Sequence, residues 1–192
     1  MGSDPNGVRP RPGGEPQNLY ALVIYVPEPL GSFLDELRLK LVPDCNPHAH
    51  ISVLPPRTLP VAPEATIEEA RGIVAGFPPF DIELGQIEVF PVTDVIYISV
   101  ESGTAHLQQM HHALNQGSLA CNEPFPYHPH LTLAQDLEYG RVVPLFKRAT
   151  ELWHQFEGRR TFRAEHTVFV QNVNGNGWID LAEGPLRAVP VA

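Results

Sequence analysis

A four-residue pattern occurs twice in this chain, and it restricts the fold more than any other feature does. The first tetrad is His50-Ile51-Ser52-Val53 and the second is His130-Leu131-Thr132-Leu133, so both read histidine, apolar, hydroxyl, apolar. Successive side chains of a β-strand point to opposite faces. Each tetrad therefore predicts a strand that buries two aliphatic side chains and presents a histidine and a hydroxyl together on the other face.

The elements expected around the two tetrads follow one order, strand, helix, tetrad strand, helix, strand. Leucines and a phenylalanine at helical spacing predict the first helix, and Thr66 is the expected N-cap of the second helix. In the first half we expect strands at 19–26, 49–54 (ended by Pro55-Pro56) and 80–90, and helices at 30–41 and 63–76. In the second half we expect strands at 94–101, 130–134 and 162–173, and helices at 104–115 and 141–155. A tight turn at 174–177 and a last strand at 178–181 are expected to follow.

This repetition predicts an α+β protein with two lobes related by a pseudo-twofold axis. Each lobe is expected to be a small antiparallel sheet backed by helices, with the active-site groove between the lobes. The lobes would correspond to sequence halves of about 18–92 and 93–184, within one domain spanning 18–184. Residues 1–17, rich in Pro and Gly, are expected to form a disordered tail, and 185–192 a loose one.

Composition narrows the class of partner. The formal net charge of −9 argues against a surface that coats long nucleic-acid duplexes, because such surfaces depend on Lys and Arg. A small phosphorylated ligand in a local site is compatible with that charge. No apolar run approaches the ~18–20 residues that span a bilayer, so we expect no membrane segment. Cys45 and Cys121 stand far apart and form no CxxC pattern, which favours reduced thiols in the cytoplasm.

The tetrads carry the residues needed to cleave a phosphodiester without a metal or cofactor. An imidazole titrates near neutral pH, so His50 and His130 on opposite sides of a phosphorus could act as general base and general acid. Ser52 and Thr132 could donate hydrogen bonds to the non-bridging phosphate oxygens. The pair predicts a catalytic site more strongly than either tetrad alone.

Residues 50–53 and 130–133 resemble the paired HxTx motifs of the two-histidine (2H) phosphoesterase superfamily. This superfamily includes the 2'-5' RNA ligase-like proteins and the cyclic phosphodiesterases, and the stretches 95–98 and 129–137 look most like its YjcG-like bacterial branch. The resemblance covers 19–181 and implies a bilobal fold and a hydrolase acting on a nucleotide or RNA terminus with a cyclic or 2'-5'-linked phosphodiester. The motif Thr is replaced by Ser52, which keeps the hydroxyl.

Several neighbours of the tetrads have alternative readings. His48 and His128 precede the motif histidines by two residues, so they could line the groove, or the four histidines could converge on a metal ion. Arg57 could reach a phosphate, and Tyr127 could stack on a base. The same groove could also bind a nucleotide or RNA end without turning it over. His111 is expected at the surface or the edge of the core.

Overall fold

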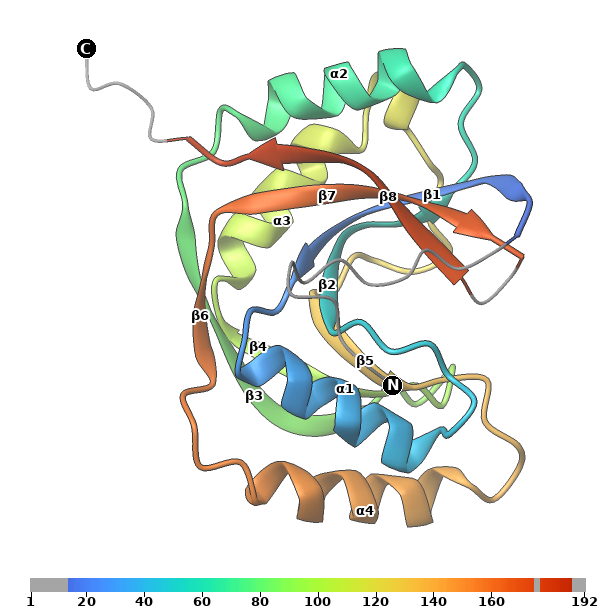
Figure 1. The fold of residues 1–192 in the computed structure, drawn as a ribbon, viewed down its shortest axis with the longest axis vertical. Coiled ribbons are helices and arrows are strands. Elements are labelled where there is room, and N and C mark those ends of the chain that lie inside the picture. Colours follow the sequence, from blue (N-terminus) through green and yellow to red (C-terminus); the bar gives the residue numbers. More distant parts are fainter. Residues whose placement is uncertain (1–13, 175–176, 188–192) are drawn as a thin grey trace.

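The computed structural model describes residues 14–174 and 177–187, which form two four-stranded sheets and four α-helices (Figure 1). The strands are β1 (Pro16–Tyr25), β2 (His50–Arg57), β3 (Phe80–Val89), β4 (Ile96–Ser102), β5 (His130–Ala134), β6 (Thr161–Ala164), β7 (His166–Val173) and β8 (Gly177–Pro185). The helices are α1 (Leu30–Leu41), α2 (Pro63–Val74), α3 (Thr104–Leu114), α4 (Val142–His154) and the short 3₁₀ helix η1 (Gly117–Leu119).

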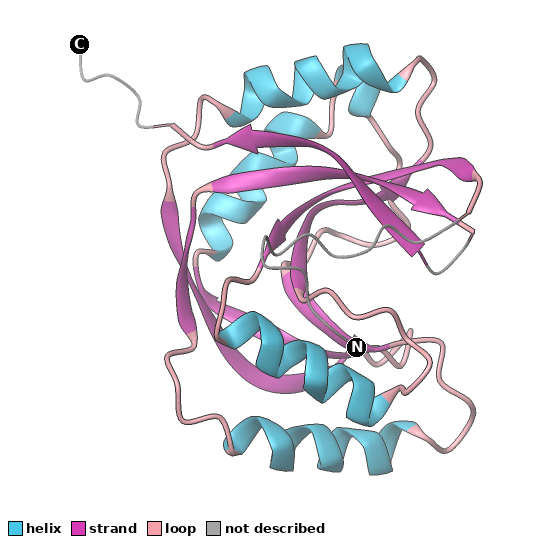
Figure 2. Ribbon diagram, in the orientation of Figure 1, coloured by secondary structure: helices cyan, strands magenta, loops and turns pink. Residues whose placement is uncertain are grey.

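The strands pair in the orders β2-β1-β7-β8 and β5-β4-β3-β6, and all the pairs are antiparallel. Helices α2 and α3 pack on the first sheet, and α1 and α4 pack on the second (Figure 2). The structure therefore confirms the predicted α+β class with two lobes, each an antiparallel sheet backed by helices. Among the described residues, no helix is long and apolar enough to cross a membrane.

The lobes do not coincide with the two sequence halves, which corrects the expected division at residue 92. The element order does repeat, but strands are exchanged: β3 of the first half pairs with β4, and β7 of the second half pairs with β1 and brings β8 with it. The single strand expected over 162–173 is interrupted at Glu165, and its two parts, β6 and β7, belong to different sheets. The chain thus passes from one lobe to the other at this residue.

The aliphatic side chains of both tetrads lie in one hydrophobic core that is shared by the lobes. Ile51, Val53 and Leu131 are fully buried, and Leu133 is almost so. The alternation predicted from the tetrads is therefore confirmed, because the histidine and the hydroxyl residue of each tetrad are only half-buried. Burying these side chains from two edge strands holds both tetrads against a common core.

The expected limits of the two tails are wrong. Strand β1 begins at Pro16 instead of residue 19, so residues 16 and 17 lie in a sheet and not in a tail. Pro185 ends β8, and the buried Leu186 donates its backbone N–H to the Glu165 carbonyl, so this part of the chain is not loose. Residues 1–13, 188–192 and the turn residues 175–176 lie outside the described part.

The prolines after the first tetrad do not end the strand. Pro55 and Pro56 lie within β2, an edge strand, at a register shift in its pairing with β1 between Leu54 and Arg57. Edges and bulges are the places in a sheet where proline is tolerated. Thr66 is not an N-cap: α2 begins three residues earlier at Pro63, and the Thr66 side chain is buried inside the helix. Proline at the first helical position explains the earlier start.

Candidate active site

The two motif histidines are held in the same way. The Nδ1 atom of His50 lies 2.6 Å from the carbonyl oxygen of His48, and Nδ1 of His130 lies 2.6 Å from that of His128. A carbonyl oxygen only accepts, so each Nδ1 carries the proton and donates it. Each neutral ring therefore presents Nε2 as the nitrogen that can take up a proton. The residue two positions before each histidine acts here through its backbone.

The two tetrads lie on neighbouring edge strands of different sheets. Strand β2 is the edge of the first sheet, β5 is the edge of the second, and the two are in contact. Figure 1 shows both strands in the middle of the molecule, between the helix pairs. Ser52 and Thr132 are half-buried, as are the histidines two residues before them. The fold thus brings together residues that are 80 positions apart in the sequence.

Both imidazoles are harder to protonate than a histidine in water. Burial, and to a smaller extent the positive charges of Arg38, His48 and His130, lower the pKa of His50 to about 4, although the bond to the His48 carbonyl opposes this. Burial also lowers the pKa of His130. The effect of the His130 charge on the pKa of His50 agrees with the contact between β2 and β5. Both rings are therefore neutral at pH 7 in the unliganded protein.

Aromatic rings flank both histidines. Tyr25 stacks on His48 with ring centroids 3.4 Å apart, and it meets His50 edge-on at 6.4 Å. On the other side, Phe90 lies edge-on to His130 at 5.0 Å and stacks on Tyr97 at 4.0 Å. The aromatic surroundings explain the desolvation of the two imidazoles.

The side chain of His128 belongs to the same aromatic cluster. Its ring lies 5.4 Å from Phe90, 5.8 Å from Tyr97 and 6.5 Å from His130. Nothing in the sequence connects Phe90 with this site, because Phe90 lies 40 residues before the second tetrad and follows β3. Only the pairing of β3 with β4 brings it there.

The four-histidine metal site that the sequence left open is not formed. In the part of the chain that the structure describes, no group of three or more His, Cys, Asp or Glu side chains is placed to hold a metal ion. His48 is stacked on Tyr25, whereas His128 packs beside Phe90. The two rings that precede the motif histidines are thus engaged by different aromatic neighbours.

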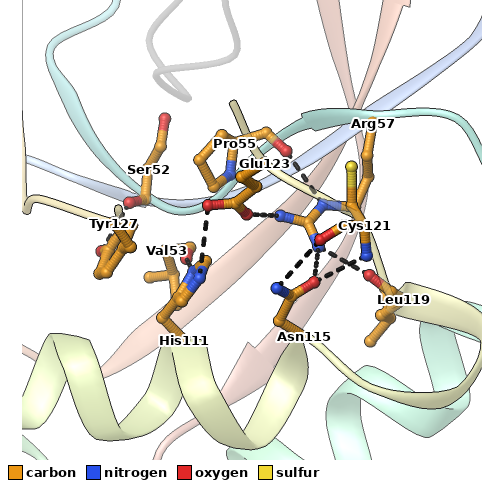
Figure 3. A network of polar contacts seen from close by, with 10 residues as sticks. All are labelled: Ser52, Val53, Pro55, Arg57, His111, Asn115, Leu119, Cys121, Glu123 and Tyr127. Carbon is orange, nitrogen blue, oxygen red and sulfur yellow. Dashed lines mark hydrogen bonds and ion pairs between the residues drawn. The ribbon is translucent and has the colours of Figure 1, made fainter. Parts of the chain in front are cut away.

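Arg57 does not line the site, which corrects one expectation. Its side chain is buried and donates to the side chains of Asn115 and Glu123 at 2.8 and 2.6 Å, and to the Leu119 carbonyl at 2.6 Å (Figure 3). A fourth bond, from Nε, reaches the Pro55 carbonyl at 3.0 Å. The two terminal guanidinium nitrogens join β2 to the segment after α3, and Nε donates back within β2, so Arg57 is a structural cation.

Tyr127 is also engaged elsewhere, and it packs against the core instead of offering a face to a base. Its ring stacks on His111 with centroids 3.9 Å apart, and its hydroxyl donates to the Ser52 carbonyl at 2.8 Å. Burial, reinforced by the Glu123 carboxylate, raises the pKa of Tyr127. Figure 3 shows the Ser52 side chain pointing away from Tyr127 and His111. Tyr127 therefore supports the first tetrad through its backbone, on the side away from the Ser52 hydroxyl.

His111 is buried at the core edge, as expected, but its partners were not foreseen. Its Nδ1 lies 2.8 Å from the Val53 carbonyl, and its Nε2 lies 3.5 Å from Glu123. Glu123 thus lies between Arg57 and His111 (Figure 3). No spacing rule in the sequence connects these residues, since they come from a strand, a helix and a loop.

Comparisons with known sequences point to one family. The sequence model of the 2'-5' RNA ligase superfamily matches residues 26–176. A protein of Geobacillus kaustophilus named "Putative phosphoesterase" is 30% identical over 140 residues, which cover 67% of this chain and 77% of that protein. A relative of the same name from Oceanobacillus iheyensis is 37% identical over 84 residues. That alignment covers 43% of this chain and about half of the relative, 49%.

Solved structures share the fold at low sequence identity. E. coli LigT complexed with 3'-AMP has a TM-score of 0.62 and 16% identity, covering 91% of this chain and 100% of that chain. Kluyveromyces marxianus Usb1 with uridine monophosphate has a TM-score of 0.50 and 16% identity, covering 88% and 98%. These likenesses establish that the same arrangement of strands and helices occurs in other proteins.

Proposed function

Because the chain belongs to the 2'-5' RNA ligase superfamily, we propose that it is a metal-independent phosphodiesterase. We propose as its substrate a small nucleotide or an RNA end that carries a 2',3'-cyclic or a 2'-5'-linked phosphodiester. The supporting observation is that His50 and His130 are held by equivalent bonds, each with Nε2 as its proton-accepting nitrogen. The structural neighbours bound to 3'-AMP and uridine monophosphate are consistent with a ligand of this size.

The proposed reaction uses one imidazole on each side of the phosphorus. Nε2 of one ring takes a proton from the attacking water, and the other ring, protonated, gives a proton to the departing oxygen as its bond to phosphorus breaks. Ser52 and Thr132 donate hydrogen bonds to the non-bridging oxygens, where negative charge gathers. An anionic phosphate beside a neutral imidazole raises its pKa, so the substrate itself supplies the charge that makes one ring an acid.

Replacing either motif histidine tests the proposal. We expect His50→Ala and His130→Ala each to lower kcat by about 10²-fold or more on a 2',3'-cyclic nucleotide or a 2'-5'-linked dinucleotide, because each removes one proton-transfer group. Product formation is followed by chromatography, and far-UV circular dichroism checks the fold. The exposed His154→Ala serves as a matched control and should keep full activity. Full activity in both motif variants would overturn the proposal.

The main alternative is a nucleotide-binding module without turnover. The bound nucleotides in the LigT and Usb1 structures give this alternative its support. Calorimetric titration with 3'-AMP and with a 2',3'-cyclic nucleotide, run beside the product assay, separates the two functions. Binding of both ligands with no product from any cyclic or 2'-5'-linked substrate would favour the module.

We place the protein in the cytoplasm as part of the same proposal. Cys45 and Cys121 are both free and partly exposed. Unpaired thiols are typical of reducing compartments. Fractionation of cells that produce the tagged protein tests this placement.

A further inference from the structure

Arg38 on α1 has an unusual environment for a cation. Its Nε atom is buried and has no hydrogen-bond partner, which makes it the one such side-chain atom found among the described residues. A buried donor without an acceptor is costly, and more so when it carries charge. Such a group in a native protein calls for a ligand, a water molecule or a functional role.

The fold ties the turn of α1 that carries Arg38 to the first tetrad. Asp35 lies three residues earlier on α1, so the two side chains leave the helix on the same side. The Asp35 carboxylate accepts a 2.7 Å hydrogen bond from the backbone N–H of Ala49, the residue directly before His50. This bond ties the turn of α1 that carries Arg38 to the start of the tetrad strand.

The charge of Arg38 affects the pKa of the histidine in the first tetrad, and it is not among the causes of the shift in the second. Its positive charge is among the factors that lower the pKa of His50, whereas the charge that acts on His130 is that of His128. The other arginine near the first tetrad, Arg57, is fully occupied by its buried partners. The ion pairs among the described residues involve cations other than Arg38. Burial lowers the pKa of Arg38, and the charges of Cys45 and Asp35 oppose this to a smaller extent.

We propose that Arg38 forms an anion subsite at the His50 end of the active site, where its guanidinium binds an oxygen of the substrate phosphate. This inference rests on the proposed function and deepens it, since it makes the two ends of the site unequal. A guanidinium offers a planar set of donors that suits a phosphate, and an anion placed there would supply the missing acceptor for Nε. It would also offset the repulsion between Arg38 and a protonated His50.

Phosphate binding to Arg38 variants tests the subsite without relying on turnover. Inorganic phosphate and a 2',3'-cyclic nucleotide are titrated into the wild type, Arg38→Met, Arg38→Lys and the control Arg148→Met, whose side chain is exposed on α4. We expect Kd for both ligands to rise about tenfold in Arg38→Met, because a charge-assisted hydrogen bond is lost. Arg38→Lys should recover part of that loss, and the control should match the wild type.

A second measurement distinguishes binding by Arg38 from a purely structural effect. NMR titration of the His50 ring should give a higher pKa in Arg38→Met than in the wild type, because a neighbouring positive charge is gone. Added phosphate should raise the pKa of His50 more in the wild type than in the variant. If Arg38→Met does not fold, Arg38→Gln carries the same two expectations.

The outcomes separate this inference from the proposed function. Equal phosphate affinity in Arg38→Met and the wild type, or no phosphate binding by the wild type, overturns the subsite even where the enzyme cleaves a phosphodiester. Arg38-dependent phosphate binding without any turnover supports the subsite and contradicts the proposed function alone.

Discussion

At the residue scale, the carbonyl two positions before each motif histidine decides what its ring can do. The bonds from Nδ1 of His50 and His130 select one tautomer and orient Nε2. Burial then keeps both rings neutral at pH 7 by lowering their pKa. A neutral ring is ready to act as a base, and the acid form must come from the charge of a bound anion.

The lowered pKa of His50 predicts a loss of stability in acid. In the unfolded chain the ring takes a proton near pH 6.5, but in the folded protein near pH 4, so protons favour the unfolded chain between these values. We expect the free energy of unfolding to fall as pH drops from 6.5 to 4. His50 contributes at most about 3 kcal/mol, and less in practice because its side chain is only half-buried.

Urea unfolding at pH 7 and pH 4.5 measures this effect. His50→Gln cannot take up the proton, so it should lose less stability over the same pH change than the wild type does. The exposed His154→Gln is the control and should behave as the wild type. An acid loss of equal size in His50→Gln and the wild type would refute the assignment to this ring.

At the element scale, the buried pair of Arg57 and Glu123 joins β2 to the chain that leads into β5. The side chains are 2% and 13% exposed, and their closest atoms are 2.6 Å apart. Tyr127, in the same connection, donates to the Ser52 carbonyl in the first tetrad. The loop before the second tetrad is thus fastened to the strand of the first one, which sets how the tetrads lie relative to each other.

Removing one member of this pair should be costly. We expect Arg57→Met to lower the free energy of unfolding by roughly 3–5 kcal/mol, because it leaves the Glu123 charge buried without its cation. Glu123→Gln in the same background should recover part of the loss, which gives a double-mutant cycle from urea unfolding. The exposed pair Arg148 and Glu151 is the control, with an expected coupling within about 1 kcal/mol of zero. Additive effects of Arg57→Met and Glu123→Gln would contradict the coupling.

At the scale of the whole molecule, the exchange of strands makes the two lobes interdependent. Each sheet contains strands from both halves of the sequence, and one hydrophobic core joins them. Unfolding of one sheet would therefore also disrupt the chain connections and the shared core that stabilise the other sheet. This argues for one cooperative unfolding unit in spite of the two-lobed shape.

The two tryptophans report on the lobes separately. Trp153 on α4 packs with the second sheet, and Trp178 lies in β8 of the first. We expect the fluorescence of Trp178→Phe and of Trp153→Phe each to change at the same urea concentration as that variant's far-UV circular dichroism. Separate midpoints for fluorescence and dichroism within one variant would show that the lobes unfold independently. Trp153→Phe should be the less stable variant, because the indole is fully buried and donates to the Gly85 carbonyl.

The sequence alone determined the local structure of the candidate site. Period-two alternation placed His50 and Ser52, and His130 and Thr132, opposite the buried aliphatics, because side-chain direction on a strand depends only on the backbone. The order of elements and the α+β class were also predictable from the repeated pattern, and the family from the resemblance of the two tetrads to the paired HxTx motifs.

Only the tertiary structure decided which strands pair and which polar groups meet. The placement of β3 and β7 in opposite sheets, the engagement of Arg57 and Tyr127 by other partners, and the bond that ties α1 to Ala49 all depend on contacts between residues distant in sequence. Such contacts follow from how whole elements bury their apolar faces in a shared core, and no local periodicity records that choice.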